Sequence, residues 1–186
     1  MKTAIILIGP ISTGKSTQAE LLSQKLGLPR VSMDDVRWDY YAEIDYSEEK
    51  AAELRENGGF AGLYPYWKPF EIHAVERALS EHHNCVIDFG AGHSVYEDET
   101  LFARAEKALQ PYANVILLLP SPNLDESVRI LRTRNNEWDG RSGDFEVHAH
   151  FVKHPSNHRL AKHTVYTKDK SPDETCAEII GLIRSR

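Results

Sequence analysis

The segment from Gly9 to Ser16 constrains this chain more than any other feature. Its sequence, GPISTGKS, matches the phosphate-loop (Walker A) pattern G-x-x-x-x-G-K-[ST] and lies between the apolar residues 3–8 and a helical pattern over residues 15–26. In that setting the glycines let backbone N–H groups point at phosphate oxygens, and the helix N-terminus favours an anion. The sequence therefore predicts an α/β fold that binds a nucleoside triphosphate, rather than a glycine turn that carries a lysine by chance.

The loop also predicts which side chains bind ATP and magnesium. Lys15 is expected to reach the outer phosphates, and the hydroxyl of Ser16 is expected to coordinate Mg²⁺. Other residues of the loop and of the first helical turn are expected to contact the nucleotide: Gly9, Ser12, Thr13, Gly14 and Thr17. The predicted cofactors are thus ATP and Mg²⁺.

Composition excludes several protein classes. At 186 residues the chain fits one domain, residues 1–186, and its net charge of −6 disfavours binding to a nucleic-acid backbone. The apolar run after Lys2 is too short for an export signal and ends at the glycine loop. Cys85 and Cys176 lack metal-type spacing and are expected to be reduced, buried thiols. We therefore expect a cytoplasmic protein, monomeric or homodimeric, with no membrane or nucleic-acid partner.

Strand and helix patterns alternate along the chain. Such alternation predicts a three-layer α/β/α fold around a five-stranded parallel sheet. The expected strands are residues 3–8, 29–32, 85–89, 114–119 and 164–167. The expected helices are residues 15–26, residues 124–134 and a last helix that begins at the capping box Ser171-Pro172-Asp173-Glu174.

Five short strands with the phosphate loop after the first resemble the small P-loop kinases. Residues 5–35, the cluster Gly90-Ala91-Gly92 and residues 115–177 are similar to the shikimate kinase branch of the nucleoside monophosphate kinase-like fold. The resemblance implies a sheet order of 2-3-1-4-5 and a lid. It also implies transfer of the γ-phosphoryl group of ATP to a small-molecule acceptor.

Acidic residues follow the second strand and end the third. Because ligands gather at the carboxyl edge of a parallel sheet, Asp34 is the candidate to orient the acceptor hydroxyl or act as base and to join the magnesium shell. Asp35 is a second candidate, in contact with the acceptor. Asp34 could instead cap a helix over residues 35–38. Asp88 is expected either to hold Mg²⁺ or its water, or to hydrogen-bond the backbone of the phosphate loop.

Arginines follow the fourth strand, where a lid is expected at residues 135–143. By resemblance, Arg129 packs against the adenine ring, and a planar guanidinium suits such stacking. Arg134 and Arg141 are the candidates to stabilise charge on the transferred phosphoryl group. Arg132 is expected to form a surface ion pair.

The acceptor-binding region is expected within residues 36–84. Nine of the 17 aromatic residues lie there: Trp38, Tyr40, Tyr41, Tyr46, Phe60, Tyr64, Tyr66, Trp67 and Phe70. That density indicates either a pocket for a ring or an apolar face, or a helical layer that uses the aromatic residues as its core. From Asp34 to Glu56, nine acids outnumber three bases, which favours a neutral or cationic acceptor. Gly90, Ala91 and Gly92 let an acceptor approach the backbone, and His93 beside them is a further acceptor contact.

The chain departs from the shikimate kinase pattern where that family grips a carboxylate. The arginine expected after a phenylalanine is replaced in Phe70-Glu71, and Glu71 cannot bind a carboxylate. Lys153 and Arg37 are the candidates to compensate. We therefore expect an acceptor other than shikimate. A metal stripe of His150, His154 and His158 is disfavoured because Pro155 interrupts their helix.

Three functions fit these patterns. The first is an ATP-dependent kinase with a small-molecule acceptor, which uses the loop, the acids and the arginines together. The second is a nucleoside or nucleotide kinase, in which the aromatic residues stack on a base. The third is a regulatory P-loop ATPase, which has no need of an aromatic acceptor pocket.

Overall fold

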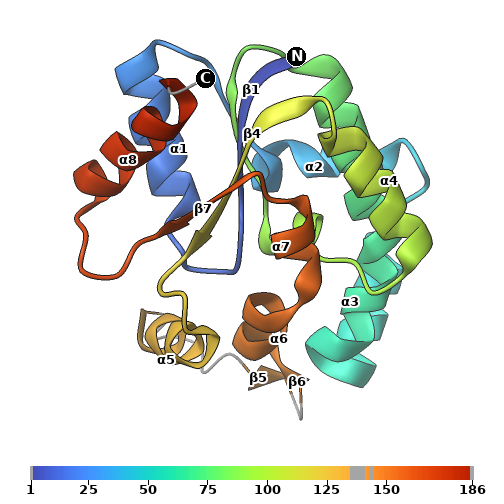
Figure 1. The fold of residues 1–186 in the computed structure, drawn as a ribbon. Helices are drawn as coiled ribbons and strands as arrows, with labels where there is room; N and C mark the ends of the chain where they lie inside the picture. The colour runs from blue at the N-terminus through green and yellow to red at the C-terminus, as the bar shows by residue number, and fades with distance from the viewer. Residues whose placement is uncertain (1, 135–140, 143–144, 185–186) are drawn as a thin grey trace.

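A five-stranded parallel sheet forms the middle layer of the protein (Figure 1). The structure is a computed structural model that describes residues 2–134, 141–142 and 145–184. The strand order is β2-β3-β1-β4-β7. Because β5 and β6 form a separate sheet, β7 is the fifth strand of the main sheet along the chain, and the predicted order 2-3-1-4-5 is confirmed. The strands are β1 (Lys2–Ile8), β2 (Arg30–Ser32), β3 (Val86–Asp88), β4 (Tyr112–Leu119) and β7 (His163–Tyr166). Each overlaps its predicted range, with ends that differ by one or two residues.

Strand β1 lies at the centre of the sheet. Ile6 is in register with Ile87 of β3 on one side and with Val115 of β4 on the other, and all three side chains are fully buried. A parallel strand covered on both faces needs apolar residues at every position, which explains the unbroken apolar runs in β1 and β4. The loop that follows β1 is therefore delivered to the carboxyl edge of the sheet.

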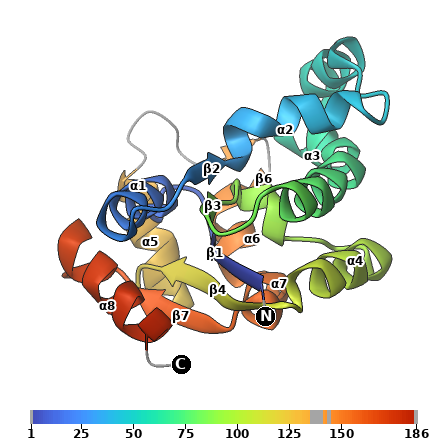
Figure 2. The same cartoon turned by 90° about the horizontal axis from the view of Figure 1, so that it is seen from above.

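One face of the sheet is covered by two helices (Figure 2). They are α1 (Lys15–Leu26), which ends at Gly27 in the left-handed region, and α8 (Pro172–Arg184). The predicted capping box precedes α8: Glu174 Oε2 accepts a hydrogen bond from Ser171 N at 2.7 Å, and Ser171 Oγ accepts one from Glu174 N at 3.2 Å. Leu22 of α1 and Ile179 of α8 pack with sheet residues in one apolar core.

The opposite face carries a larger helical layer and the larger apolar core. Its helices are α2 (Met33–Ala42), α3 (Glu48–Glu81), α4 (Glu99–Leu109) and α7 (Pro155–Leu160). Asp98 caps α4 by accepting hydrogen bonds from Thr100 N at 2.8 Å and Leu101 N at 3.0 Å. This layer contains the predicted acceptor-binding region.

Helix α3 is long because it combines two helical segments across a break. Gly59 has φ 58° and ψ −148°, which is not helical, and Pro65 and Pro69 follow within the second segment. A Cβ on Gly62 would lie 2.7 Å from Leu54 O, so only glycine lets the chain approach itself so closely here. The first part of α3 extends beyond the carboxyl edge of the sheet (Figure 1).

Smaller elements gather at that carboxyl edge (Figure 1). They are the 3₁₀ helix η1 (Ala91–Ser94), α5 (Leu124–Arg134), α6 (Val147–Lys153) and the antiparallel pair β5 (Arg141–Ser142) and β6 (Phe145–Glu146). Within the predicted lid at residues 135–143, only the backbone of β5 is described, and the side chain of Arg141 lies outside the described residues. The expected interruption by Pro155 is confirmed, because His154 separates α6 from α7 with extended backbone angles. In the part of the chain that the structure describes, none of the helices has the length and apolarity needed to cross a bilayer.

Candidate active site

The phosphate loop is curled by backbone conformations that few side chains allow. Gly9, Ser12 and Gly14 have φ values of 136°, 63° and 91°. A Cβ on Gly9 would lie 2.5 Å from Leu118 O of β4, so the loop passes β4 too closely for any side chain at this position. Thr13 Oγ1 donates a hydrogen bond to Pro10 O at 3.0 Å, which ties the two sides of the loop together. The backbone of the loop itself therefore holds the curled conformation.

Lys15 spans this loop from inside. Its side chain is 8% exposed, and Nζ donates hydrogen bonds to Gly9 O at 2.8 Å and Pro10 O at 2.7 Å. Burial lowers the pKa of Lys15 to about 8, although the charges of Asp34 and Asp88 oppose that shift. The three residues expected to act on phosphates and magnesium are therefore close enough to interact electrostatically.

The N-terminus of α1 faces the loop with its donors uncapped. Gly14 is the N-cap residue and provides no side-chain cap. Ser16 and Thr17, in the first turn, are exposed. Backbone N–H groups and a partial positive charge at such a helix end suit phosphate oxygens, and the Ser16 hydroxyl is accessible to a cation bound with them.

Asp88 forms an ion pair with Arg30, a residue that was not predicted to belong to the site. Arg30 donates from Nε to Asp88 Oδ1 at 3.0 Å and from Nη2 to Oδ2 at 3.1 Å, and Asp88 is 4% exposed. The pair forms because β2 and β3 lie side by side, with Arg30 one strand away from Asp88. The partner of Asp88 is thus Arg30, not the loop backbone proposed as its alternative to magnesium.

Asp34 lies at the open side of the site. It is the second residue of α2, and Ser32 is the N-cap, so the expectation that Asp34 caps a helix over residues 35–38 is wrong. The carboxylate is 57% exposed, and its Oδ1 lies 3.3 Å from Arg37 Nη1. Because Ser16 and Asp34 present accessible oxygens, this set of donors fits Mg²⁺, which binds few protein ligands beside phosphates. No group of three or more His, Cys, Asp or Glu side chains among the described residues could hold a metal by itself.

A cavity of about 210 Å³ opens beside Asp34 and the phosphate loop. Its lining comes from the loop, α2, α3, η1 and α6: Ile11, Asp34, Arg37, Phe60, Tyr64, Trp67, Glu71, Gly90, Ala91, Gly92, His93 and Phe151. The structure therefore brings the predicted acceptor residues Arg37, Gly90, Ala91, Gly92 and His93 to one place.

Two predicted acceptor residues do not line this cavity. Lys153 is 51% exposed on α6, and its Nζ forms an ion pair with Asp125 Oδ1 of α5 at 2.6 Å. The structure therefore does not bring Lys153 to this cavity, because α6 turns this side chain toward α5. Asp35 is exposed on α2 and is also absent from the lining.

The wall of the cavity contains a buried ion pair. Lys68 Nζ lies 2.5 Å from Glu71 Oε2 and donates hydrogen bonds to Gly92 O at 3.0 Å and Val95 O at 2.9 Å. It also lies 3.9 Å from the centroid of the Tyr64 ring. The ammonium thus ties α3 to the glycine run. Lys68 was not predicted as a site residue, although its spacing of three residues from Glu71 was a usable signal.

His93 and Arg37 contribute buried nitrogens. His93 is 1% exposed, and its Nε2 has no hydrogen-bond partner in the described part of the chain. Burial, assisted by the charge of Arg37, lowers the pKa of His93 to about 3, so the imidazole is neutral. The Nε of Arg37 is likewise buried without a partner there, and its guanidinium lies 4.5 Å from the Trp38 ring centroid.

The aromatic residues divide between core and cavity. Tyr41 and Phe70 belong to the apolar core, while Phe60 and Trp67 line the cavity. Both interpretations of the aromatic density, pocket and core, are therefore confirmed for different members of the group.

The predicted arginines of α5 are not among the residues that line the cavity. Arg129 is exposed, and Arg134 Nη1 lies 3.5 Å from Thr167 Oγ1, just after β7. Arg132 forms the expected surface ion pair, with its Nη2 3.2 Å from Glu146 Oε2. Arg134 is thus held near the carboxyl end of the last strand.

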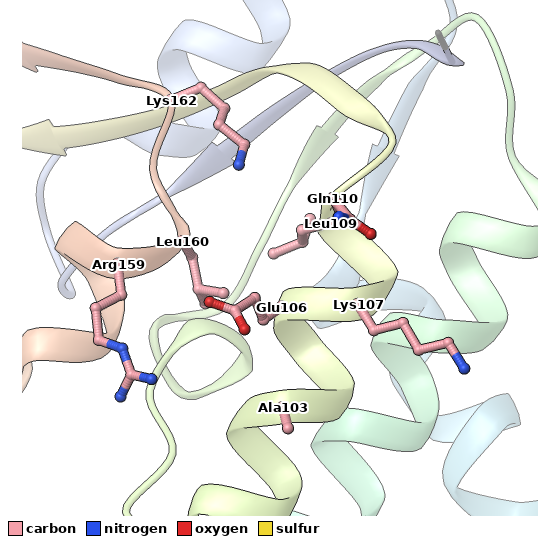
Figure 3. A pocket seen from close by; sticks show the side chains of 8 residues that line it. All are labelled: Ala103, Glu106, Lys107, Leu109, Gln110, Arg159, Leu160 and Lys162. Carbon is pink, nitrogen blue, oxygen red and sulfur yellow. The ribbon is translucent and has the colours of Figure 1, made fainter.

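A larger hollow of about 320 Å³ lies at the amino end of the sheet, away from the loop (Figure 3). Glu106 of α4 and Lys162, which precedes β7, extend into it. Arg159 at its rim pairs with Glu99 at 3.1 Å and stacks 3.7 Å from the Phe102 ring. This hollow shares no residue with the phosphate loop or the predicted site.

Comparisons with known proteins agree with this architecture. No family model matches the chain. It is 22% identical over 181 residues to the shikimate kinase of Flavobacterium psychrophilum, covering 96% of this chain and 98% of that enzyme. A match to the adenylate kinase of Anaeromyxobacter dehalogenans is 38% identical over 55 residues, 30% of this chain, and spans only 26% of that enzyme.

The solved structures are similar along the whole chain. Shikimate kinase from Acinetobacter baumannii in complex with shikimate superposes with a TM-score of 0.65 at 18% identity, over 100% of this chain and 94% of that one. The chain therefore has the fold of the shikimate kinases, and the predicted resemblance is confirmed.

Proposed function

We propose that this protein is an ATP-dependent kinase that transfers the γ-phosphoryl group to a hydroxyl of a small-molecule acceptor. The observation that carries the proposal is the position of Asp34, between the phosphate loop and a lined cavity. Phosphoryl transfer requires a nucleotide site and an acceptor site that share one edge, with a carboxylate between them. A loop that only binds nucleotide needs no such neighbour.

On the nucleotide side, we propose that Lys15 exchanges its two carbonyl partners for phosphate oxygens. Nζ already lies inside the loop, where it bonds Gly9 O and Pro10 O. Ser16 and Asp34 would hold Mg²⁺, which supplies charge neutralisation on the phosphates when bound. Asp88, fixed by Arg30, would act on the magnesium shell through its remaining lone pairs.

On the acceptor side, we propose that Asp34 accepts the hydrogen of the attacking hydroxyl. The ion pair with Arg37 fixes the direction of the carboxylate, and fixed geometry is the main contribution a protein makes to this reaction. Arg129 would pack on adenine, and Arg134 or Arg141 would stabilise charge on the phosphoryl group as it moves.

The nucleoside kinase alternative rests on the aromatic lining of the cavity. Phe60, Tyr64 and Trp67 could stack on a base. A nucleoside monophosphate, however, needs several cations around its phosphate. Arg37 is the only arginine among the described lining residues, and it is paired with Asp34. This alternative is therefore restricted to unphosphorylated nucleosides.

The test measures ADP release by the purified protein with Mg-ATP, alone and with each member of a panel of hydroxylated compounds. We expect ADP release to rise with an acceptor, and mass spectrometry to find that acceptor phosphorylated. Lys15→Ala should abolish the signal, whereas Lys25→Ala, on the exposed side of α1, should retain it. Equal ADP release with and without every compound would instead support the regulatory ATPase.

A further inference from the structure

We infer that the acceptor is a small, neutral, polyhydroxylated ring of the sugar or cyclitol class. This inference rests on the proposed kinase function and names the chemical class that the cavity is built to hold. It follows from three observations: the charges at the cavity are already paired, buried polar atoms remain beside it, and aromatic rings form its walls.

Among the described residues, the cations that line the cavity or its wall are already engaged. Arg37 pairs with Asp34 at 3.3 Å, and Lys68 uses its three hydrogens on Glu71, Gly92 O and Val95 O. Lys153 is turned away on α6. A carboxylate or phosphate on the acceptor would have to compete with Asp34 for Arg37, or break the Lys68–Glu71 pair and leave the buried carboxylate of Glu71 without compensation, which is costly.

The anions are compensated in the same way. Among the described lining residues, Asp34 and Glu71 are the two acids, and each has a cationic partner within 3.5 Å. An acceptor with an amine would therefore find no unpaired carboxylate in the described lining to bind its ammonium group. Since His93 is neutral as well, the lining selects against a net charge of either sign.

Buried polar atoms beside the cavity still lack hydrogen bonds. Among the described residues, His93 Nε2, Arg37 Nε and the hydroxyl of Tyr41 are buried without a partner. The Tyr41 ring centroid lies 6.5 Å from that of His93, so these groups belong to one region. Unsatisfied polar groups are rare in folded proteins, and hydroxyl groups, which both donate and accept, can satisfy the two that belong to lining residues, His93 and Arg37.

The aromatic walls of the cavity indicate that the acceptor is a ring. Phe60 and Tyr64 stack with centroids 5.3 Å apart, and Trp67 adds a third ring to the lining. Aromatic faces suit the C–H faces of a saturated ring, while its hydroxyls reach the polar wall. The volume of about 210 Å³ is below the roughly 300 Å³ at which pockets for drug-sized ligands begin, which limits the acceptor to about one ring.

The test uses three hexoses that differ in one charged group: glucose, glucuronate and glucosamine, with myo-inositol and shikimate added as cyclic comparisons. Each is added to the full-length protein with Mg²⁺ and a non-hydrolysable ATP analogue, and the melting temperature is measured. We expect glucose or myo-inositol to raise the melting temperature beyond the shift given by the analogue alone. A larger additional shift with glucuronate, glucosamine or shikimate, or none with either neutral ring, would overturn the inference.

A matched variant tests the charge balance. Glu71→Gln leaves the ammonium of Lys68 uncompensated, so the ratio of glucuronate to glucose affinity should rise roughly tenfold or more. Glu76→Gln, on the same helix but paired with Arg104 at the surface, should leave the ratio unchanged. An unchanged ratio in a Glu71→Gln protein that still melts cooperatively would contradict the paired-charge model.

These measurements separate the two proposals. If the ATP analogue with Mg²⁺ does not raise the melting temperature, that result counts against the kinase proposal, whatever the effect of the sugars. An intact analogue shift combined with a preference for a charged ring would leave the kinase proposal standing and reject only the neutral class.

Discussion

Asp34 Oδ1 and His93 Nδ1 lie 2.7 and 2.8 Å from a single point, the position that a Cβ on residue 90 would occupy. Gly90 therefore lets a carboxylate from α2 and an imidazole from η1 approach the same stretch of backbone. The residue proposed to orient the acceptor hydroxyl and the residue with an unsatisfied ring nitrogen are thus positioned together. Any side chain at residue 90 would displace one of them.

Gly90→Ala should accordingly impair acceptor use more than nucleotide binding. We expect acceptor-dependent turnover to fall by about tenfold or more, with a loss of about 1–3 kcal/mol in the free energy of unfolding from overpacking. The affinity for an ATP analogue should change little, because the phosphate loop is untouched. The control is Gly58→Ala, whose added Cβ meets nothing within 4 Å. Steady-state kinetics and urea unfolding of both variants check this, and unchanged turnover in Gly90→Ala would exclude the close approach as a functional requirement.

Substitution of the adjacent acids Asp34 and Asp35 should have different effects on turnover. Asp34→Asn keeps the size of the side chain but removes the hydrogen-bond-accepting charge at the cavity edge, so turnover should fall by roughly 10²- to 10⁴-fold. Asp35→Asn alters an exposed residue that does not line the cavity and should stay within a few-fold of wild type. Measured turnover rates decide between them. A larger loss in Asp35→Asn would transfer the proposed role to that residue.

Sequence patterns predicted the parts of this protein that depend on local chemistry. The phosphate loop, the five strands and helices α1 and α5 each carry an uninterrupted pattern, and the sheet order followed from the resemblance. A helical layer was one of the two interpretations of this region, but the bounds of α3 were not predicted, because Gly59, Pro65 and Pro69 oppose a helix in isolation. Tertiary packing against α2 and α4 stabilises it instead.

Partners distant in sequence were the least predictable part of the site. Arg30 and Asp88 meet only because β2 lies beside β3, and Lys68 reaches Gly92 only because α3 packs on η1. Lys153 was assigned to the acceptor by resemblance, whereas its position on α6 directs it to Asp125. These pairings cannot be predicted from residue type and position in the chain alone, because they depend on which elements pack together in the fold.

Acid should destabilise the protein through His93. Its folded-state pKa is about 3, below the ordinary value of 6.5, so between these pH values the unfolded chain binds a proton that the folded chain excludes. The free energy of unfolding should therefore fall as the pH drops from 6.5 toward 3, by roughly 1 kcal/mol per pH unit from this group. Urea unfolding at several pH values gives the free energy of unfolding at each pH. This free energy should depend less steeply on pH in His93→Gln than in wild type. His158→Gln, at an exposed position, is the control, and equal slopes in all three proteins would contradict the burial argument.

Nucleotide affinity should depend on pH through Lys15. Burial lowers its pKa to about 8 in the free protein, so the ammonium begins to lose its proton above that pH. Because a triphosphate binds the charged form, the dissociation constant of a non-hydrolysable ATP analogue with Mg²⁺ should rise up to about tenfold per pH unit above pH 8 and stay nearly flat between pH 7 and 8. Isothermal titration calorimetry from pH 7 to 9.5 measures this. Lys15→Met should bind weakly with no bend near pH 8, while Lys25→Ala should keep the wild-type profile. A wild-type affinity that stays constant through pH 9.5 would show that the charge of Lys15 does not contribute to nucleotide binding.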